Sequence, residues 1–268
     1  MLRFRAVLLF IIAGTISLEA GEPLFVPHGA REMGIAFSAT ATPGHWSCFN
    51  NPALLNSAAG FGVSASLENR FMLPELSSKA LSAVIASLPV PLGMVVSHYG
   101  NGDYYRIFTG LSSAVTIMKG VSLGVQVDYI SENSAGDYRN VSHITFETGM
   151  ILDLSVSLTA GLHVTNPVRS LNSLPSSINA AVRWKHSDDL FLTLEGSKTT
   201  GEPLSVHCGV NWQILNRLAL RSGYMSSPSC FSFGMGFKTG SFQTDAGFLL
   251  NSATGVTSSL SIIWTVSK

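Results

Sequence analysis

The sequence carries little charge. Asp, Glu, Lys and Arg together make up 12% of its 268 residues, about half of their usual share in a soluble domain. The 16 basic residues balance the 16 acidic ones, so no positive excess indicates a nucleic-acid partner. Hydrophobic residues account for 46% of the chain. Because so few charges remain to keep a surface in water, we expect much of the folded surface to face a different medium.

Long apolar runs, cysteine frameworks and metal motifs are missing as well. After residue 20 no run of 18 apolar residues occurs, which excludes a membrane-spanning helix there. Cys48, Cys208 and Cys230 are too few for a disulfide framework, and whether Cys208 and Cys230 pair stays open. The spacings CxxC, HxxxH and HxH are absent, so we expect no metal site and no cofactor.

Residues 1–20 have the pattern of an export signal. Arg3 and Arg5 precede an apolar stretch over residues 6–16, and Ala20 is the expected residue before the cleavage point. A membrane-anchoring helix is the alternative, but the stretch is shorter than the roughly 20 residues that cross a bilayer. We therefore expect a Sec-type signal peptide over 1–20 that is cleaved on export.

Strict alternation dominates the chain from residue 60 to the end. From Leu204 to Ile214, for example, every second residue is apolar and the residues between them are small or polar. Most such segments have about ten residues, which is the length a tilted strand needs to cross a bilayer, whereas strands of soluble proteins average nearer five or six. Fourteen segments follow this pattern, near 60–70, 79–88, 91–99, 104–118, 120–131, 141–153, 155–164, 174–186, 188–198, 203–214, 216–225, 229–238, 240–250 and 257–267.

The connections between these segments alternate in length. Tight connections follow the even-numbered segments and mostly longer ones follow the odd-numbered segments, as in outer-membrane barrels. We therefore predict an all-β fold over residues 60–268, an antiparallel transmembrane β-barrel of about 14 strands, with 12 as the alternative count. Apolar side chains would then face lipid and polar ones the lumen. The possible lumen-lining residues carry both signs of charge: Arg183, Glu195, His207, Arg217 and Arg221.

Residues 21–59 lack the alternation and form a separate N-terminal segment. Residues 29–36 favour a short helix, and Pro52 suits the first position of a second helical turn. A segment of this kind before a barrel can fill the lumen as a partly helical plug.

This segment resembles the start of outer-membrane barrels of the PorV/PorQ type, which are related to FadL-like long-chain fatty acid transporters. The resemblance rests on an Ala-Arg pair, small residues after it and an Asn-Pro-Ala motif, here Ala30-Arg31, Met33-Gly34, Ala36, Ala39 and Asn51-Pro52-Ala53-Leu54-Leu55. A second family-like element is the strand that runs into Asn166-Pro167. The resemblance implies a fourteen-stranded barrel with an N-terminal plug, whose plug motif is Arg31, Gly34, Asn51, Pro52 and Ala53.

Two functions follow from the resemblance and the pattern. The first is passive transport of a small hydrophobic molecule past the plug, where Arg31 either holds the plug or binds a carboxylate. The second is a scaffold or shuttle role in a protein secretion system, with Asn166 and Pro167 in a contacting outer loop. The connections stay shorter than the ligand-catching outer loops of fatty acid transporters, which argues against uptake of a hydrophobic ligand.

Other classes of protein fit the sequence less well. We expect no enzyme, because Ser and His occur in no recognisable catalytic spacing. A soluble exported β-protein is a further alternative to the barrel. The expected location is the bacterial outer membrane. The expected partners are membrane lipid together with a hydrophobic small molecule or a secreted protein, without nucleic acid, and the sequence sets no oligomeric state.

Overall fold

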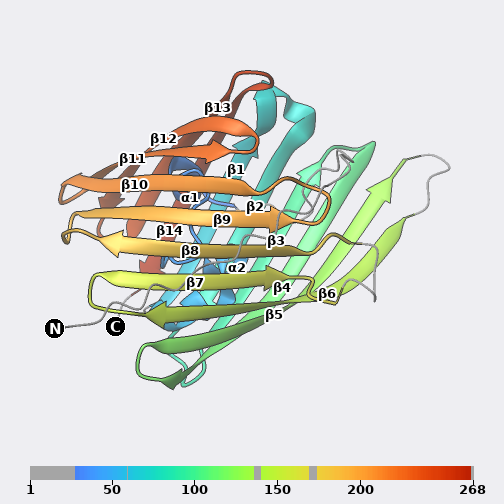
Figure 1. The fold of residues 1–268 in the computed structure, drawn as a ribbon. Helices are drawn as coiled ribbons and strands as arrows, with labels where there is room; N and C mark the ends of the chain where they lie inside the picture. The colour runs from blue at the N-terminus through green and yellow to red at the C-terminus, as the bar shows by residue number, and fades with distance from the viewer. Residues whose placement is uncertain (1–27, 59, 136–139, 169–173, 267–268) are drawn as a thin grey trace.

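A computed structural model describes residues 28–58, 60–135, 140–168 and 174–266. The expected signal peptide at 1–20 and residues 21–27 and 59 of the expected N-terminal segment lie outside the described residues. Within the described chain, fourteen strands form one closed antiparallel barrel (Figure 1), in which each strand pairs with its neighbours in sequence and β1 pairs with β14. The predicted all-β fold and its count of fourteen strands are therefore confirmed.

The strands run in chain order around the barrel and have 8 to 15 residues each. Their bounds are β1 Phe61–Asn69, β2 Ser77–Ile85, β3 Leu92–Gly100, β4 Tyr104–Met118, β5 Val121–Ser134, β6 Val141–Asp153, β7 Leu158–Thr165, β8 Ser177–Lys185, β9 Leu190–Thr199, β10 Ser205–Leu215, β11 Leu218–Ser226, β12 Ser229–Thr239, β13 Phe242–Asn251 and β14 Gly255–Val266.

The connections fall into the two groups that the sequence indicates. One rim has tight turns, such as residues 119–120, 216–217 and 240–241, and the other has longer connections such as 70–76 and 166–176. Two short 3-10 helices, η2 (Arg70–Met72) and η3 (Pro74–Leu76), form the β1–β2 connection. Not every connection on the second rim is long. The β11–β12 hairpin on that rim has only two residues between its strands, Ser227 and Pro228.

The wall of the barrel is apolar outside and mainly polar inside. In β10, Val206, Cys208 and Val210 are exposed, whereas the residues between them are buried. Alternation places successive side chains on opposite faces of a strand, so burial here distinguishes inside from outside. Cys208 points outward and Cys230 inward, and all three cysteines are free. Cys208 and Cys230 therefore form no disulfide.

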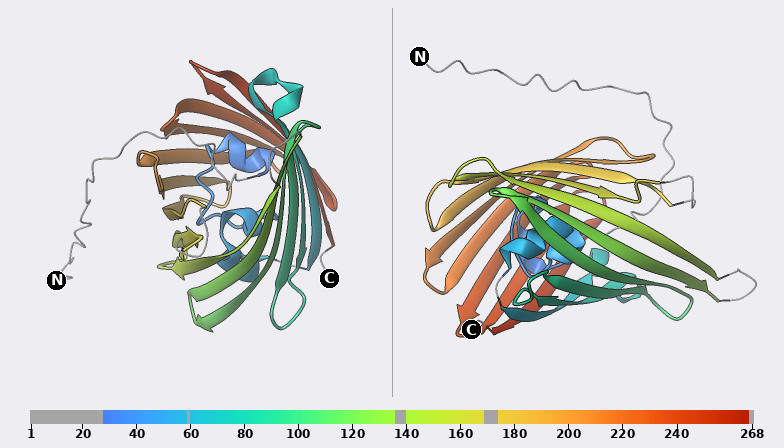
Figure 2. Two further views of the ribbon diagram at one scale, coloured as in Figure 1. Left: turned by 90° about the vertical axis from the view of Figure 1, so that its right-hand side faces the viewer. Right: turned by 90° about the horizontal axis from the view of Figure 1, so that it is seen from below.

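Residues 28–58, which we call the interior segment, lie inside the barrel (Figure 2). The segment contains α1 (Ala30–Gly34), α2 (Ser47–Asn50) and the 3-10 helix η1 (Pro52–Ser57). Helix α1 packs against β11 to β14, and η1 packs against β3 to β6 on the other side of the barrel. The expected helix within residues 29–36 is confirmed, and so is Pro52 as the first residue of a second helical turn.

The helices of the described residues are all short. None of them is long and apolar enough to cross a membrane.

The apolar outer wall leads to a prediction about stability in lipid. Leu111 lies near the middle of β4, between Met94 and Val127 of the neighbouring strands, and is 61% exposed. Replacing it by arginine places a charge where lipid would lie. We expect Leu111→Arg to lower the free energy of unfolding in bilayers by about 2–4 kcal/mol, while Leu111→Met leaves it nearly unchanged. Urea unfolding in lipid vesicles measures both, and equal stability of the two variants would contradict a lipid-facing wall.

Candidate functional site

The interior segment touches the barrel wall through glycine. At Gly124 of β5 an added methyl group would overlap the backbone nitrogen of Ala53, and at Gly161 of β7 it would overlap the carbonyl oxygen of Thr40. Glycine weakens the middle of a strand, and it often marks a place where another backbone approaches closely. Such a close approach occurs at both of these glycines. The backbone of the segment also lies against Gly223, Gly234 and Gly247, whereas its side chains fill the space at Gly62, Gly93, Gly149 and Gly209.

Asn51 holds the segment to this wall. Its side-chain nitrogen donates to the carbonyl oxygens of Thr40 at 2.9 Å and Leu162 at 3.2 Å, so that it joins the segment to β7. Its side-chain oxygen accepts from the backbone nitrogen of Ala53 at 3.0 Å and caps η1, which Pro52 begins. This residue is fully buried, and an unpaired amide there would cost about 1–3 kcal/mol. Three of the five predicted plug-motif residues thus form one anchor.

The hydrogen bond and the ion pair of Arg31 both lie within the interior segment. The Arg31 guanidinium donates to the carbonyl oxygen of Pro43 at 2.7 Å and lies 3.8 Å from the Glu32 carboxylate. Burial raises the pKa of Glu32 to about 6, against the opposing effect of Arg31. The remaining motif residue, Gly34, lies against Gly234 and accepts at its carbonyl oxygen a 3.1 Å hydrogen bond from Ser232. Arg31 therefore stabilises the conformation of the interior segment, and Gly34 allows the segment to pack closely against β12.

The inner wall of β2 to β5 departs from the polar pattern. Its inward positions hold Val84, Val95, Phe108, Ala114 and Ile130, all buried, and we call these five residues the apolar sector. Cys48, Phe49 and Leu55 of the interior segment pack against them, together with Leu174 of the β7–β8 connection.

An aromatic group extends the apolar sector into the interior segment. The Phe49 ring lies 5.8 Å from the ring of Phe108, 6.0 Å from that of Trp46 and 4.6 Å from that of His28, measured between centroids. Burial lowers the pKa of His28 to about 3 and raises the pKa of the Cys48 thiol to about 11. Both groups are therefore neutral near pH 7, and this side of the lumen is apolar and uncharged at its centre.

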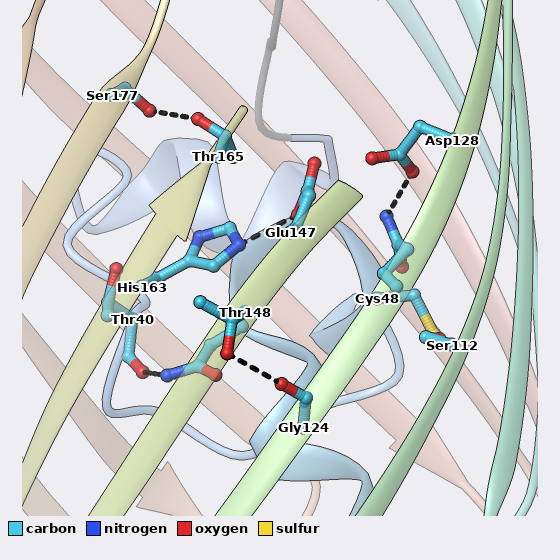
Figure 3. Close-up of polar contacts among 12 residues, drawn as sticks. Thr40, Cys48, Ser112, Gly124, Asp128, Glu147, Thr148, His163, Thr165 and Ser177 are labelled. Carbon is cyan, nitrogen blue, oxygen red and sulfur yellow. Dashed lines mark hydrogen bonds and ion pairs between the residues drawn. The ribbon is translucent and has the colours of Figure 1, made fainter. Parts of the chain in front are cut away.

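The part of the lumen next to the apolar sector, along β5 to β9, is polar. The Nε2 of His163 on β7 lies 2.7 Å from Oε2 of Glu147 on β6, and Gln126 donates to Asp128 at 2.9 Å within β5 (Figure 3). Glu195 on β9 accepts from the backbone nitrogen of Thr40 at 3.0 Å. We call His163, Glu147, Asp128 and Glu195 the polar sector. Through Glu195 it fixes the interior segment at Thr40, and along β5 it adjoins the apolar sector.

Of the predicted lumen-lining residues, four face inward and one does not. Glu195 and His207 bind the interior segment, since His207 Nδ1 lies 2.8 Å from the carbonyl oxygen of Ala36. Arg221 pairs with Asp245 at 2.7 Å. Arg183 is half-buried and donates to Thr159 at 3.3 Å.

Arg217 was predicted to line the lumen, and this placement is wrong. It is exposed in the two-residue turn between β10 and β11. The sequence alternation ran on into the turn, where a side chain no longer belongs to either face.

Asn166 and Pro167 differ in exposure. Asn166 is buried with a positive φ of 47°, and its amide donates to the Leu174 carbonyl at 2.9 Å and accepts from Thr145 at 2.8 Å. Pro167 is exposed. Asn166 therefore joins the end of β7 to Leu174 and Pro175, and only Pro167 of this pair is available at the surface.

Sequence reasoning missed the glycines of the wall and the apolar sector. The signal for the first was present, because Gly124, Gly161 and Gly209 stand in the middle of alternating strands at inward positions. Helix α2 was missed because its four residues carry no helical pattern. Among the described residues, no group of His, Cys, Asp or Glu is arranged to hold a metal ion.

The close backbone contacts generate a prediction. In Gly124→Ala the new methyl group meets Ala53, and overpacking of this kind costs about 1–3 kcal/mol. We expect the interior segment to shift and to be cleaved faster by added protease, while the barrel keeps its heat-modifiable mobility in gels. The control is Gly196→Ala, since no atom lies within 4 Å of the added carbon. Equal cleavage rates in the two variants would show that the wall does not hold the segment.

Comparison with known proteins identifies the fold. No protein-family model and no curated protein matches the chain. The toluene transporter TodX of Pseudomonas putida has 10% identity and a TM-score of 0.70, over 91% of this chain and 100% of that one. The toluene transporter TbuX of Ralstonia pickettii has 10% identity and a TM-score of 0.68, over 90% and 97%. A FadL homologue of Pseudomonas aeruginosa has 11% identity and a TM-score of 0.65, over 91% and 100%. At such low identity the likeness establishes a shared barrel fold.

Proposed function

We propose that this chain is an outer-membrane barrel that lets small apolar molecules pass along the apolar sector of its lumen while the interior segment blocks ions. The observation that carries the proposal is the apolar sector itself. The inner wall of a barrel that passes only water and ions has no need of a buried Val, Phe and Ile surface. Here that surface covers adjacent strands from β2 to β5.

The outer wall supports a location in a membrane. Large apolar side chains such as Val127, Leu194 and Phe233 are exposed around the barrel, and a soluble protein rarely exposes so large a continuous apolar surface. A closed barrel leaves no unpaired strand edge in lipid. Trp184, Trp212 and Trp264 face outward near the rim with tight turns, where an interfacial aromatic girdle would lie.

The interior segment supports selectivity for apolar molecules. Backbone contact with the wall glycines, the Asn51 anchor and the Glu195 bond hold it across the lumen. Ions would need a continuous wet path, whereas a small apolar molecule needs only local side-chain movement between Phe49, Phe108 and Ile130. Desolvating an ion costs far more than desolvating a hydrocarbon, so a narrow apolar path separates the two.

The comparisons agree with this class of substrate. TodX and TbuX, which share the fold, are described as toluene transporters. We infer from them that the substrate here is a small hydrophobic molecule. The finer assignment to PorV/PorQ-type barrels, export by a cleaved signal peptide and a partnership with membrane lipid stay parts of the proposal. The alternative role as a secretion scaffold lacks a supporting observation in the neighbours named above and in the described loops, so we do not propose it.

Uptake of a monoaromatic hydrocarbon by proteoliposomes tests the proposal. We expect radiolabelled toluene to enter vesicles with the barrel faster than empty vesicles. Phe108→Gln should lower that rate severalfold, because it places an amide in the apolar sector. The control is Thr257→Val, which changes the polarity of a buried inward position of β14 and leaves the apolar sector intact. Uptake no faster than in empty vesicles, or equal loss in both variants, would contradict transport along the apolar sector.

A further inference from the structure

A groove lies on the outer surface of the barrel, across β2, β1, β14 and β13. Its volume is about 490 Å³. Two successive rows of outward side chains line it, together with Glu68, Ser78 and Ser259 between the rows, whose side chains are buried on the inner face. The row farther from the β1–β2 connection holds Lys79, Leu67, Leu260 and Ala246, and the next row holds Ser77, Asn69, Ser258 and Phe248. The small side chain of Ala246 leaves space between larger neighbours.

Lys79 gives this groove its charge. Across the described strands, only two charged side chains take outward positions, Lys79 of β2 and Lys198 of β9. Both are cationic and both lie at the rim with the longer connections. Lys198 is bonded to the carbonyl oxygen of Glu202, whereas the described residues offer Lys79 no ion pair. A lysine on a lipid-facing wall extends its ammonium group to the membrane surface, where anionic groups are found.

The polar residues of the groove stand on the membrane-surface side of Lys79. Ser77, Asn69 and Ser258 lie across three adjacent strands at one level. The side-chain oxygen of Asn69 is buried and has no hydrogen-bond partner among the described residues. Because this oxygen is shielded from the groove, the row offers a bound molecule the hydroxyl groups of Ser77 and Ser258, which are both partly exposed. Leu67, Leu260 and Phe248 flank these groups with apolar surface.

A third observation places this level at a membrane surface. His98 of β3 lies opposite Lys79 and faces outward, and its ring stacks on that of Tyr105 at 5.6 Å between centroids. Aromatic and amphipathic side chains gather at the head-group level of barrels. The groove therefore spans the boundary between head groups and acyl chains.

We propose that this groove binds one lipid of the outer leaflet, a glycolipid whose sugar head group carries phosphate. Lys79 binds the phosphate, Ser77 and Ser258 form hydrogen bonds with sugar hydroxyls, and an acyl chain lies along Leu67 and Leu260. A charge-assisted bond between an ammonium and a phosphate is among the stronger polar contacts. The inference rests on the proposed membrane location, but it concerns the outer wall and not the transport path.

Native mass spectrometry of the whole protein in detergent tests the groove. The probes are a diphosphorylated glucosamine-based lipid and its dephosphorylated form, added at equal concentration. We expect the intact barrel to retain the phosphorylated lipid preferentially. Lys79→Gln should abolish this preference, and Lys198→Gln should keep it, because Lys198 lies outside the groove. Ala246→Leu should lower retention of both lipids by filling the groove while leaving the charge.

Each outcome decides the inference separately from the proposed function. Equal retention of the two lipids by the intact barrel, or equal loss in Lys79→Gln and Lys198→Gln, overturns the lipid site. Toluene uptake measured on the same preparations tests the transport path. A barrel that takes up toluene but shows no lipid preference disproves the groove alone, whereas a barrel that retains the lipid but takes up no toluene disproves the transport path alone. Heat-modifiable gel mobility confirms that each variant is folded.

Discussion

Close contact between two backbones, that of residues 28–58 and that of the barrel wall, is the constraint on which the structure depends. It requires glycine at the inward positions that face the segment, as at Gly124 and Gly161. Where the wall carries larger inward residues, the segment instead packs side chain to side chain, as Phe49 does on Phe108. The distribution of inward glycine, apolar and polar residues therefore sets both the position of the segment and the chemistry on each side of it.

This arrangement divides the lumen into two chemically different parts. Along β5 to β9 the polar sector pairs His163 with Glu147 and binds the segment through Glu195, and farther round the wall Arg221 of β11 pairs with Asp245 of β13. Glycines in β12 make the pair possible, since Gly236 leaves room for the Arg221 guanidinium to reach β13. On β2 to β5 the side chains of the apolar sector neither donate nor accept hydrogen bonds, so they present an apolar surface. In the proposed function a single inserted segment blocks ions, and its aromatic residue Phe49 packs on the apolar surface of the wall.

Much of the fold was predictable because period-two alternation reports directly on a two-faced wall. Strands such as β4 and β6 have the predicted bounds, and Pro52 begins η1 as expected. Alternation fails at turns, which explains the wrong placement of Arg217.

The site was less predictable, because its contacts join residues far apart in sequence. Nothing local shows that Asn51 reaches Leu162 or that Thr40 reaches Glu195, since their separations are 111 and 155 residues. The apolar sector was hidden for a related reason. Inward Val95, Phe108 and Ile130 stand on different strands, and each alone reads as one irregularity in an alternating pattern.

The most direct test of the account is the ion conductance of single barrels in planar bilayers, measured for the intact protein and for a variant that lacks residues 28–58. The account predicts that the intact protein inserts without conducting, because the segment closes the lumen, and that the variant conducts through an open barrel. Equal conductance of the two proteins would contradict it, because the segment would then not block the lumen.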